Sequence, residues 1–163
     1  MSFLNLDKEK VNATAKELNL LLADYHLYYQ KLRNFHWNIT GRDFFILHDK
    51  FEEMYNDTQV KIDEIAERIL TLRFRPVSNY SEYLEKSNIK ESATSLSDIE
   101  MVEALLKDHQ ALLKQLRTTL DKAADANDEG TEDLLTGYIA DLEKTSWMLD
   151  AWKTKTGDNL PKA

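Results

Sequence analysis

The sequence predicts an all-α fold, and two features of its 163 residues support this. Apolar residues recur three or four positions apart over long stretches, which is the period of an amphipathic helix. Only four Gly and two Pro occur, too few for the frequent turns of a β-sandwich or barrel. The absence of cysteine excludes disulfides, iron–sulfur clusters and thiolate metal sites. At this length we expect a single domain over residues 1–163.

The charge and hydropathy of the chain predict a cytoplasmic protein without a membrane partner. The mean hydropathy is −0.54, and no apolar run approaches the roughly 20 residues that span a bilayer. The N-terminus is charged where a secretion signal would be apolar. A net charge of −8 makes the bulk surface a poor partner for nucleic acid.

The first long helix is expected to run from about Asp7 to Asn38. Its apolar stripe consists of Leu18, Leu21, Leu22, Tyr25, Leu32 and Phe35. We expect it to end at Ile39-Thr40-Gly41, because Gly41 can take the left-handed conformation at little cost.

The second helix is expected from Asp43, a good N-cap residue, to about Leu72, since Pro76 prevents continuation. Its apolar side consists of Phe44, Leu47, Phe51, Met54, Ile62, Ile65, Ile69 and Leu72. The polar stretch 77–94 is too long for a tight hairpin. We therefore predict a crossover along the bundle, with one short helix at about 81–85.

A capping box of Ser97 and Glu100 predicts the start of the third helix, which continues to about Ala126. Its apolar face consists of Met101, Leu105, Leu112, Leu116 and Leu120. Residues 127–131 are predicted to form a turn, with Thr131 capping the fourth helix.

The fourth helix is expected to end near Lys153 and Lys155, whose charges suit the helix dipole. Its apolar face consists of Leu134, Leu135, Tyr138, Leu142, Trp147, Met148 and Trp152. Residues 1–6 and 156–163 are expected to be loose tails. Two helical pairs joined by one long crossover form the arrangement of ferritin-like four-helix bundles.

Four potential metal ligands lie on the second predicted helix: His48, Glu52, Asp63 and Glu67. Their spacing places them within an arc of roughly 100° on one side of the helix. A solvated charged face would be the simplest explanation. The four positions are, however, symmetric about a point between Asp57 and Thr58, and a solvated face has no reason for such symmetry.

One chain cannot hold a single ion with all four residues, because His48 and Asp63 are separated by roughly 22 Å of helix. A second copy, antiparallel and related by a two-fold axis, would place His48 opposite Glu67 and Glu52 opposite Asp63. Two identical sites would then form between two subunits. A di-iron site within one chain needs Glu-x-x-His on two helices, and none of the four histidines has a glutamate three residues before it.

His36 lies beside Trp37 near the end of the first predicted helix. A histidine in such a place is more often packed and hydrogen bonded than a metal ligand. A second imidazole from a neighbouring helix would nevertheless complete a His/His/carboxylate set suited to a redox-active metal. These residues alone leave both roles open.

Three motifs closely resemble the Dps family, the miniferritins first named as DNA-binding proteins from starved cells. They are Phe35-His36-Trp37-Asn38-Ile39-Thr40-Gly41, Leu47-His48-Asp49-Lys50-Phe51-Glu52 and Ile62-Asp63-Glu64-Ile65-Ala66-Glu67-Arg68. The resemblance covers nearly the whole chain, and the two histidines twelve residues apart are highly specific to the family.

The resemblance implies a cage of twelve subunits that oxidises Fe(II), with hydrogen peroxide favoured over oxygen, and stores ferric oxide. The implied di-iron ligands are His36 and His48 of one subunit with Asp63 and Glu67 of its partner. Glu52 would help to hold the second iron, and Trp37 would absorb stray oxidising equivalents. Zinc or another divalent metal could substitute for iron. The alternative is a DNA-protecting, structural cage with weak or vestigial ferroxidase activity.

The acidic turn before the fourth helix corresponds in the family to a three-fold pore. We expect Asp128, Glu129 and Asp133 to line it, although ordinary loop solubility also explains such acids. The family name leaves association with the nucleoid open. We expect weak or absent DNA binding, because residues 1–10 have no net charge and residues 153–163 carry only +2.

Overall fold

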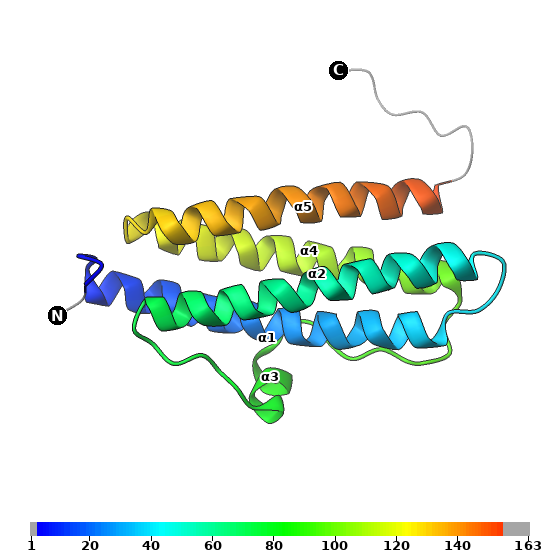
Figure 1. The fold of residues 1–163 in the computed structure, drawn as a ribbon, viewed down its shortest axis with the longest axis horizontal. Helices are drawn as coiled ribbons and strands as arrows, with labels where there is room; N and C mark the ends of the chain where they lie inside the picture. Colours follow the sequence, from blue (N-terminus) through cyan, green and yellow to red (C-terminus); the bar gives the residue numbers. More distant parts are fainter. Residues whose placement is uncertain (1–2, 155–163) are drawn as a thin grey trace, which may run out of the picture.

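The computed structural model describes residues 3–154, and this part of the chain contains five α-helices and no strand. The helices are α1 (Lys8–Asn38), α2 (Phe44–Thr71), α3 (Tyr80–Lys86), α4 (Asp98–Asp125) and α5 (Glu129–Lys153). The long helices form two antiparallel pairs, α1 with α2 and α4 with α5, and the short α3 lies outside the bundle beside α1 (Figure 1). The predicted all-α, four-helix architecture with a short helix in the crossover is confirmed.

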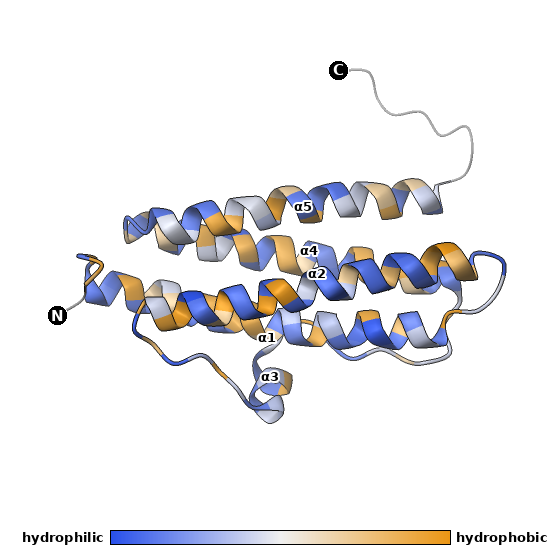
Figure 2. Ribbon diagram, in the orientation of Figure 1, coloured by the Kyte–Doolittle hydropathy of each residue, from blue (hydrophilic) through white to orange (hydrophobic). Residues whose placement is uncertain are grey.

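A continuous apolar core lies between the four long helices. Fully buried core residues include Leu18, Phe35, Phe51, Ile65 and Met101. Figure 2 shows the corresponding alternation of apolar and polar segments along the helices. Burying each such side chain contributes about 1.5–3 kcal/mol, so tertiary packing stabilises these helices more than helix propensity does. Within residues 3–154, no helix is both long and apolar enough to cross a membrane.

Most helix ends agree with the sequence. The Asp7 carboxylate accepts two backbone N–H groups at 2.9 and 3.1 Å, and Ser97 and Glu100 form the complete capping box. Asp43 occupies the N-cap of α2, but its side chain makes no capping hydrogen bond. Gly41 has the left-handed φ of +104°, but lies two residues beyond the C-cap of α1.

Thr131 does not cap the last helix, which corrects the sequence prediction. The N-cap is Asp128, three residues earlier, and its side chain accepts the Thr131 backbone N–H at 3.1 Å. The Thr131 hydroxyl donates to the same carboxylate at 2.6 Å. Both residue types are good caps, so sequence preference alone could not choose between them. Lys155 and the predicted tail 156–163 lie outside the described residues.

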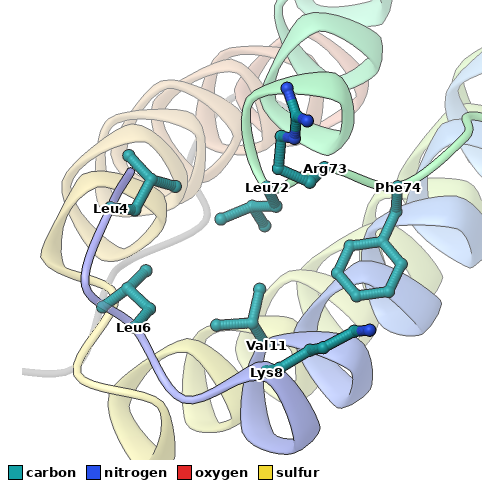
Figure 3. Close-up of a pocket in the computed structure, with 7 residues that line it drawn as sticks. All are labelled: Leu4, Leu6, Lys8, Val11, Leu72, Arg73 and Phe74. Atoms are coloured by element: carbon teal, nitrogen blue, oxygen red, sulfur yellow. The ribbon is translucent and has the colours of Figure 1, made fainter. Parts of the chain in front are cut away.

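Residues 3–6 were expected to be part of a loose tail, but in the structure they lie against the end of the bundle. Leu4 and Leu6 pack on the core and line a cavity of about 240 Å³ (Figure 3). The other lining residues are Lys8, Val11, Leu72, Arg73 and Phe74. This segment therefore covers apolar surface where α1 begins and α2 ends.

A buried carboxylate anchors the crossover to α1. Asp24 is fully buried and accepts hydrogen bonds from the Ser87 hydroxyl at 2.8 Å and the Asn88 backbone N–H at 2.6 Å. The Asn88 side-chain amide adds a third bond at 3.1 Å. Three donors satisfy a charge that would otherwise be costly to bury, and they hold the chain after α3 in place.

A second buried polar group connects three of the long helices. The Tyr28 hydroxyl of α1 lies 2.7 Å from Nε2 of His109 on α4. Nδ1 of His109 lies 2.7 Å from the Ser146 hydroxyl of α5. Burial lowers the pKa of His109 to about 4, so the imidazole is neutral at pH 7.

This burial makes stability depend on pH. Between about pH 6.5 and pH 4 the unfolded chain binds a proton at His109 and the native state does not, so the free energy of unfolding falls on acidification, by up to about 3 kcal/mol. Urea unfolding at pH 7 and pH 4.5 should therefore show a smaller acid-dependent loss in His109→Gln than in the wild type. Equal losses in both proteins would contradict the assignment.

Candidate metal centre

Two histidine rings face each other across the turn between α1 and α2. The ring centroids of His36 and His48 are 3.8 Å apart and the planes differ by 23°. Nδ1 of His36 donates to the His48 carbonyl oxygen, and Nδ1 of His48 donates to the His36 carbonyl oxygen, each at 2.9 Å. Because a carbonyl oxygen only accepts, both rings carry their proton on Nδ1 and leave Nε2 available to a metal ion.

Glu52, one helical turn after His48, completes a group of potential ligands. One ligand atom from each of His36, His48 and Glu52 lies within 4.8 Å of the other two. His36 is buried, His48 is partly buried and Glu52 is exposed, so the group opens to the surface. Two imidazole nitrogens and a carboxylate oxygen are a suitable donor set for iron or zinc.

Two aromatic residues complete the surroundings of the histidine pair. Phe44 stacks on the ring of His48 at 4.9 Å, and Tyr55 meets the ring of His36 edge-on at 5.3 Å. The Tyr55 hydroxyl donates to Glu52 at 3.2 Å, and partial burial together with this carboxylate raises the pKa of Tyr55. Neither residue was predicted from the sequence to belong to the site. Their spacing, four before His48 and three after Glu52, was the available signal.

Asp63 and Glu67 are not brought to the histidines within one subunit. Both are exposed on α2, and Asp63 is roughly 22 Å of helix away from His48. Trp37 is 58% exposed, and the Arg33 guanidinium lies over its ring at 4.7 Å.

The outward surface of α2 also carries large apolar side chains. Phe45, Ile46, Val60 and Leu70 are each more than half exposed. Figure 2 shows this apolar character at the end of α2 next to the α1–α2 turn. Exposed apolar residues along one side of a helix are typical of surfaces that contact other molecules.

At the other end of α2, Arg68 connects this helix to the acidic turn. Its Nε donates to the Thr131 hydroxyl at 2.9 Å, and its Nη2 donates to the Asp128 carboxylate. Gly130 allows this approach, because a Cβ there would lie 2.9 Å from the guanidinium. Asp128 is buried in these contacts, contrary to the expectation that it faces a pore, whereas Glu129 is exposed.

Comparison with known proteins identifies the family. The sequence model of the ferritin-like domain matches residues 15–157. DNA protection during starvation protein 2 of Bacillus anthracis is 46% identical over 135 residues, which cover 83% of this chain and 92% of that protein. The chain belongs to the Dps family.

Solved Dps structures share the same fold. The Dps protein of Vibrio cholerae O1, described as a member of a broad superfamily of ferritin-like diiron-carboxylate proteins, superposes with a TM-score of 0.91. It is 44% identical, and the match covers 94% of this chain and 98% of that one. Dps from Staphylococcus aureus gives a TM-score of 0.85 at 40% identity, covering 87% and 95% of the two chains. The resemblance to Dps is therefore confirmed.

In this Dps subunit, Arg68→Met should destabilise the fold by about 3 kcal/mol, because it leaves the buried Asp128 carboxylate without its cation. Arg117→Met is the matched control. It removes an ion pair with Glu143 in which both side chains are 53% exposed, and should cost less than about 1 kcal/mol. Urea unfolding of the two variants measures the difference, and equal losses would contradict a structural role for the Arg68–Asp128 pair.

Proposed function

We propose that this Dps protein is a ferroxidase and iron-storage protein whose sites form between two subunits. The grouping of His36, His48 and Glu52 carries the proposal, because it presents two metal-ready imidazole nitrogens and a carboxylate at the surface. Asp63 and Glu67 lie on the same helix and are exposed. An antiparallel partner would bring its own copies of these two acids to the histidines.

The apolar residues of α2 support the same two-fold arrangement. Phe45 and Leu70 stand at equal distances from the centre between Asp57 and Thr58, and both are exposed in the subunit. An antiparallel copy would therefore place Phe45 near Leu70 twice. This contact would bury apolar surface beside each metal site and exclude water from it.

The chemistry treats Fe(II) as the substrate. Two Fe(II) ions give two electrons to one hydrogen peroxide molecule, which takes up two protons and leaves as two water molecules. Because both electrons are supplied together, no hydroxyl radical is released. Carboxylate ligands favour the Fe(III) product, and zinc or another divalent ion would compete for the same donors. We propose hydrogen peroxide as the preferred oxidant and Trp37, beside His36, as a scavenger of stray oxidising equivalents.

We further propose a cytoplasmic cage of twelve subunits that holds ferric oxide and protects the cell against oxidative damage. Iron would enter through three-fold pores lined by Glu129 and Asp133, which are exposed near the start of α5. Acids repeated around such a pore would concentrate cations by electrostatic focusing. Asp128 has no part in this pore, because its carboxylate is buried against Arg68 and Thr131.

Replacing both His36 and His48 by Ala should lower the rate of Fe(II) oxidation with hydrogen peroxide by roughly 100-fold, since even the partners of metal ligands contribute 10–100-fold. His26→Ala is the control, because His26 stacks on Tyr83 away from this group. Sedimentation should give the same particle size for wild type and both variants. An unchanged oxidation rate in the double variant would refute the proposed site.

Mixed assemblies test whether each site is shared. Asp63→Ala and the His36/His48 double variant should each oxidise Fe(II) only slowly when assembled alone. In a pair formed from one copy of each, one site has every ligand and the other lacks both histidines and Asp63, so co-assembled protein should regain part of the activity. No recovery in verified mixed assemblies would contradict sites shared between subunits.

A DNA-protecting structural cage with weak or vestigial ferroxidase activity is the alternative, and the name of the Bacillus anthracis relative favours it. The structure places Lys8 and Lys10 in the first turn of α1, so these lysines do not form a free basic arm. We therefore expect little retention of plasmid DNA in a gel-shift assay at about 0.15 M salt. Tight retention would support the alternative.

A further inference from the structure

The Tyr28–His109–Ser146 group has no part in the proposed iron site. The Ser146 hydroxyl donates its one hydrogen to the Leu142 carbonyl at 2.6 Å, so its oxygen must accept from Nδ1 of His109. This fixes the proton of His109 on Nδ1 and leaves a lone pair on Nε2. The Tyr28 hydroxyl therefore donates to Nε2 at 2.7 Å.

The surroundings of Tyr28 disfavour simple ionisation of its phenol, but they leave Nε2 of His109 unprotonated and able to accept the phenolic proton. Tyr28 is only 3% exposed, and burial raises its pKa well above the usual value. His109 is also buried and its pKa is lowered to about 4, so it has no proton on Nε2 at pH 7. Removing an electron from a phenol makes it a strong acid. A buried tyrosine can therefore be oxidised readily only where a base accepts its proton at once.

We propose that Tyr28 is a redox-active tyrosine, which gives one electron to a strong one-electron oxidant while its phenolic proton moves to Nε2 of His109. With hydroxyl radical as the oxidant, the Tyr28 O–H bond breaks and an N–H bond forms on His109. The radical is reduced to hydroxide, and the protein holds a neutral tyrosyl radical beside an imidazolium. In the cell this role rests on the proposed iron function, since a lone Fe(II) ion and peroxide generate hydroxyl radical.

Aromatic contacts connect Tyr28 to the rest of the core, and a groove lies between its partner His109 and the surface. Its ring meets Tyr25 edge-on at 6.5 Å, and Tyr25 meets Tyr138 at 6.2 Å. On the other side, His109 lines a groove of about 600 Å³ between α4 and α5. Trp147, 62% exposed, lines the same groove. A tryptophan radical formed at Trp147 would therefore lie in the groove that His109, the hydrogen-bond partner of Tyr28, also lines.

Neighbouring Tyr29 provides a matched control. It lies on the same helix, but its hydroxyl faces the Gln59 side-chain amide at 3.5 Å rather than an imidazole. An amide cannot take up a proton near neutral pH. Like Tyr28→Phe, Tyr29→Phe therefore removes one tyrosine hydroxyl group, but it leaves the tyrosine–histidine pair intact.

The experiment uses the full, metal-free protein, so its outcome does not depend on iron oxidation. Azide radicals produced by pulse radiolysis oxidise exposed tryptophans first, and the decay of tryptophanyl absorption and the growth of tyrosyl absorption are then followed. Electron paramagnetic resonance of frozen samples with ring-deuterated tyrosine identifies the radical. Wild type and Tyr29→Phe should form the tyrosyl radical, and Tyr28→Phe should lose most of the signal.

His109→Gln separates proton transfer from hydrogen bonding. The Gln side chain can accept a hydrogen bond from Tyr28 but not its proton, so the tyrosyl yield should fall as in Tyr28→Phe, with circular dichroism verifying the fold. An undiminished signal in folded Tyr28→Phe or His109→Gln, or no tyrosyl radical in the wild type, would overturn the proposal. Failure of Fe(II) oxidation in the separate iron assay would refute the ferroxidase function and leave this result unaffected.

Discussion

The two hydrogen bonds between the histidine rings and each other's backbone carbonyls organise the end of the molecule that carries the proposed metal site. Each ring of the His36–His48 pair bonds to the opposite helix at 2.9 Å, so the α1–α2 turn, the ring orientation and the tautomer are set together. Neither histidine could present Nε2 correctly without the other. Once the rings are fixed, the helical period brings Glu52 to the same place, one turn further along α2.

One side of helix α2 faces the core of the subunit, and its other side faces outward. One side supplies Phe51 and Ile65 to the core, where they are fully buried. The other side carries the proposed metal ligands of α2 and several exposed apolar side chains. Stability of the subunit and completion of the proposed site therefore depend on different surfaces of one helix. Substitutions on the outer side are therefore expected to alter the proposed assembly and iron oxidation while the bundle itself remains folded.

Local sequence signals predicted the fold well because helix caps and apolar periodicity are short-range properties. The capping box at Ser97 is an example. The predicted N-cap of the last helix was wrong, because Asp128 rather than Thr131 caps α5. Arg68 contacts both residues from sixty or more positions away in the sequence, and local cap preferences cannot show such a contact. The role of His36 was open for the same reason, since its ring partner lies across a turn and spacing on one helix cannot show it.

The pairing of Arg68 with the acidic turn has a mechanical consequence. Glu67, exposed on α2, is the residue immediately before Arg68, so one rigid helical turn sets the positions of both. Because Arg68 bonds to Asp128 and Thr131, a displacement of the start of α5 would also act on the helical turn that carries Glu67. The length of the α4–α5 connection is consequently constrained, because an insertion there would disturb the Arg68 contacts as well as the loop itself.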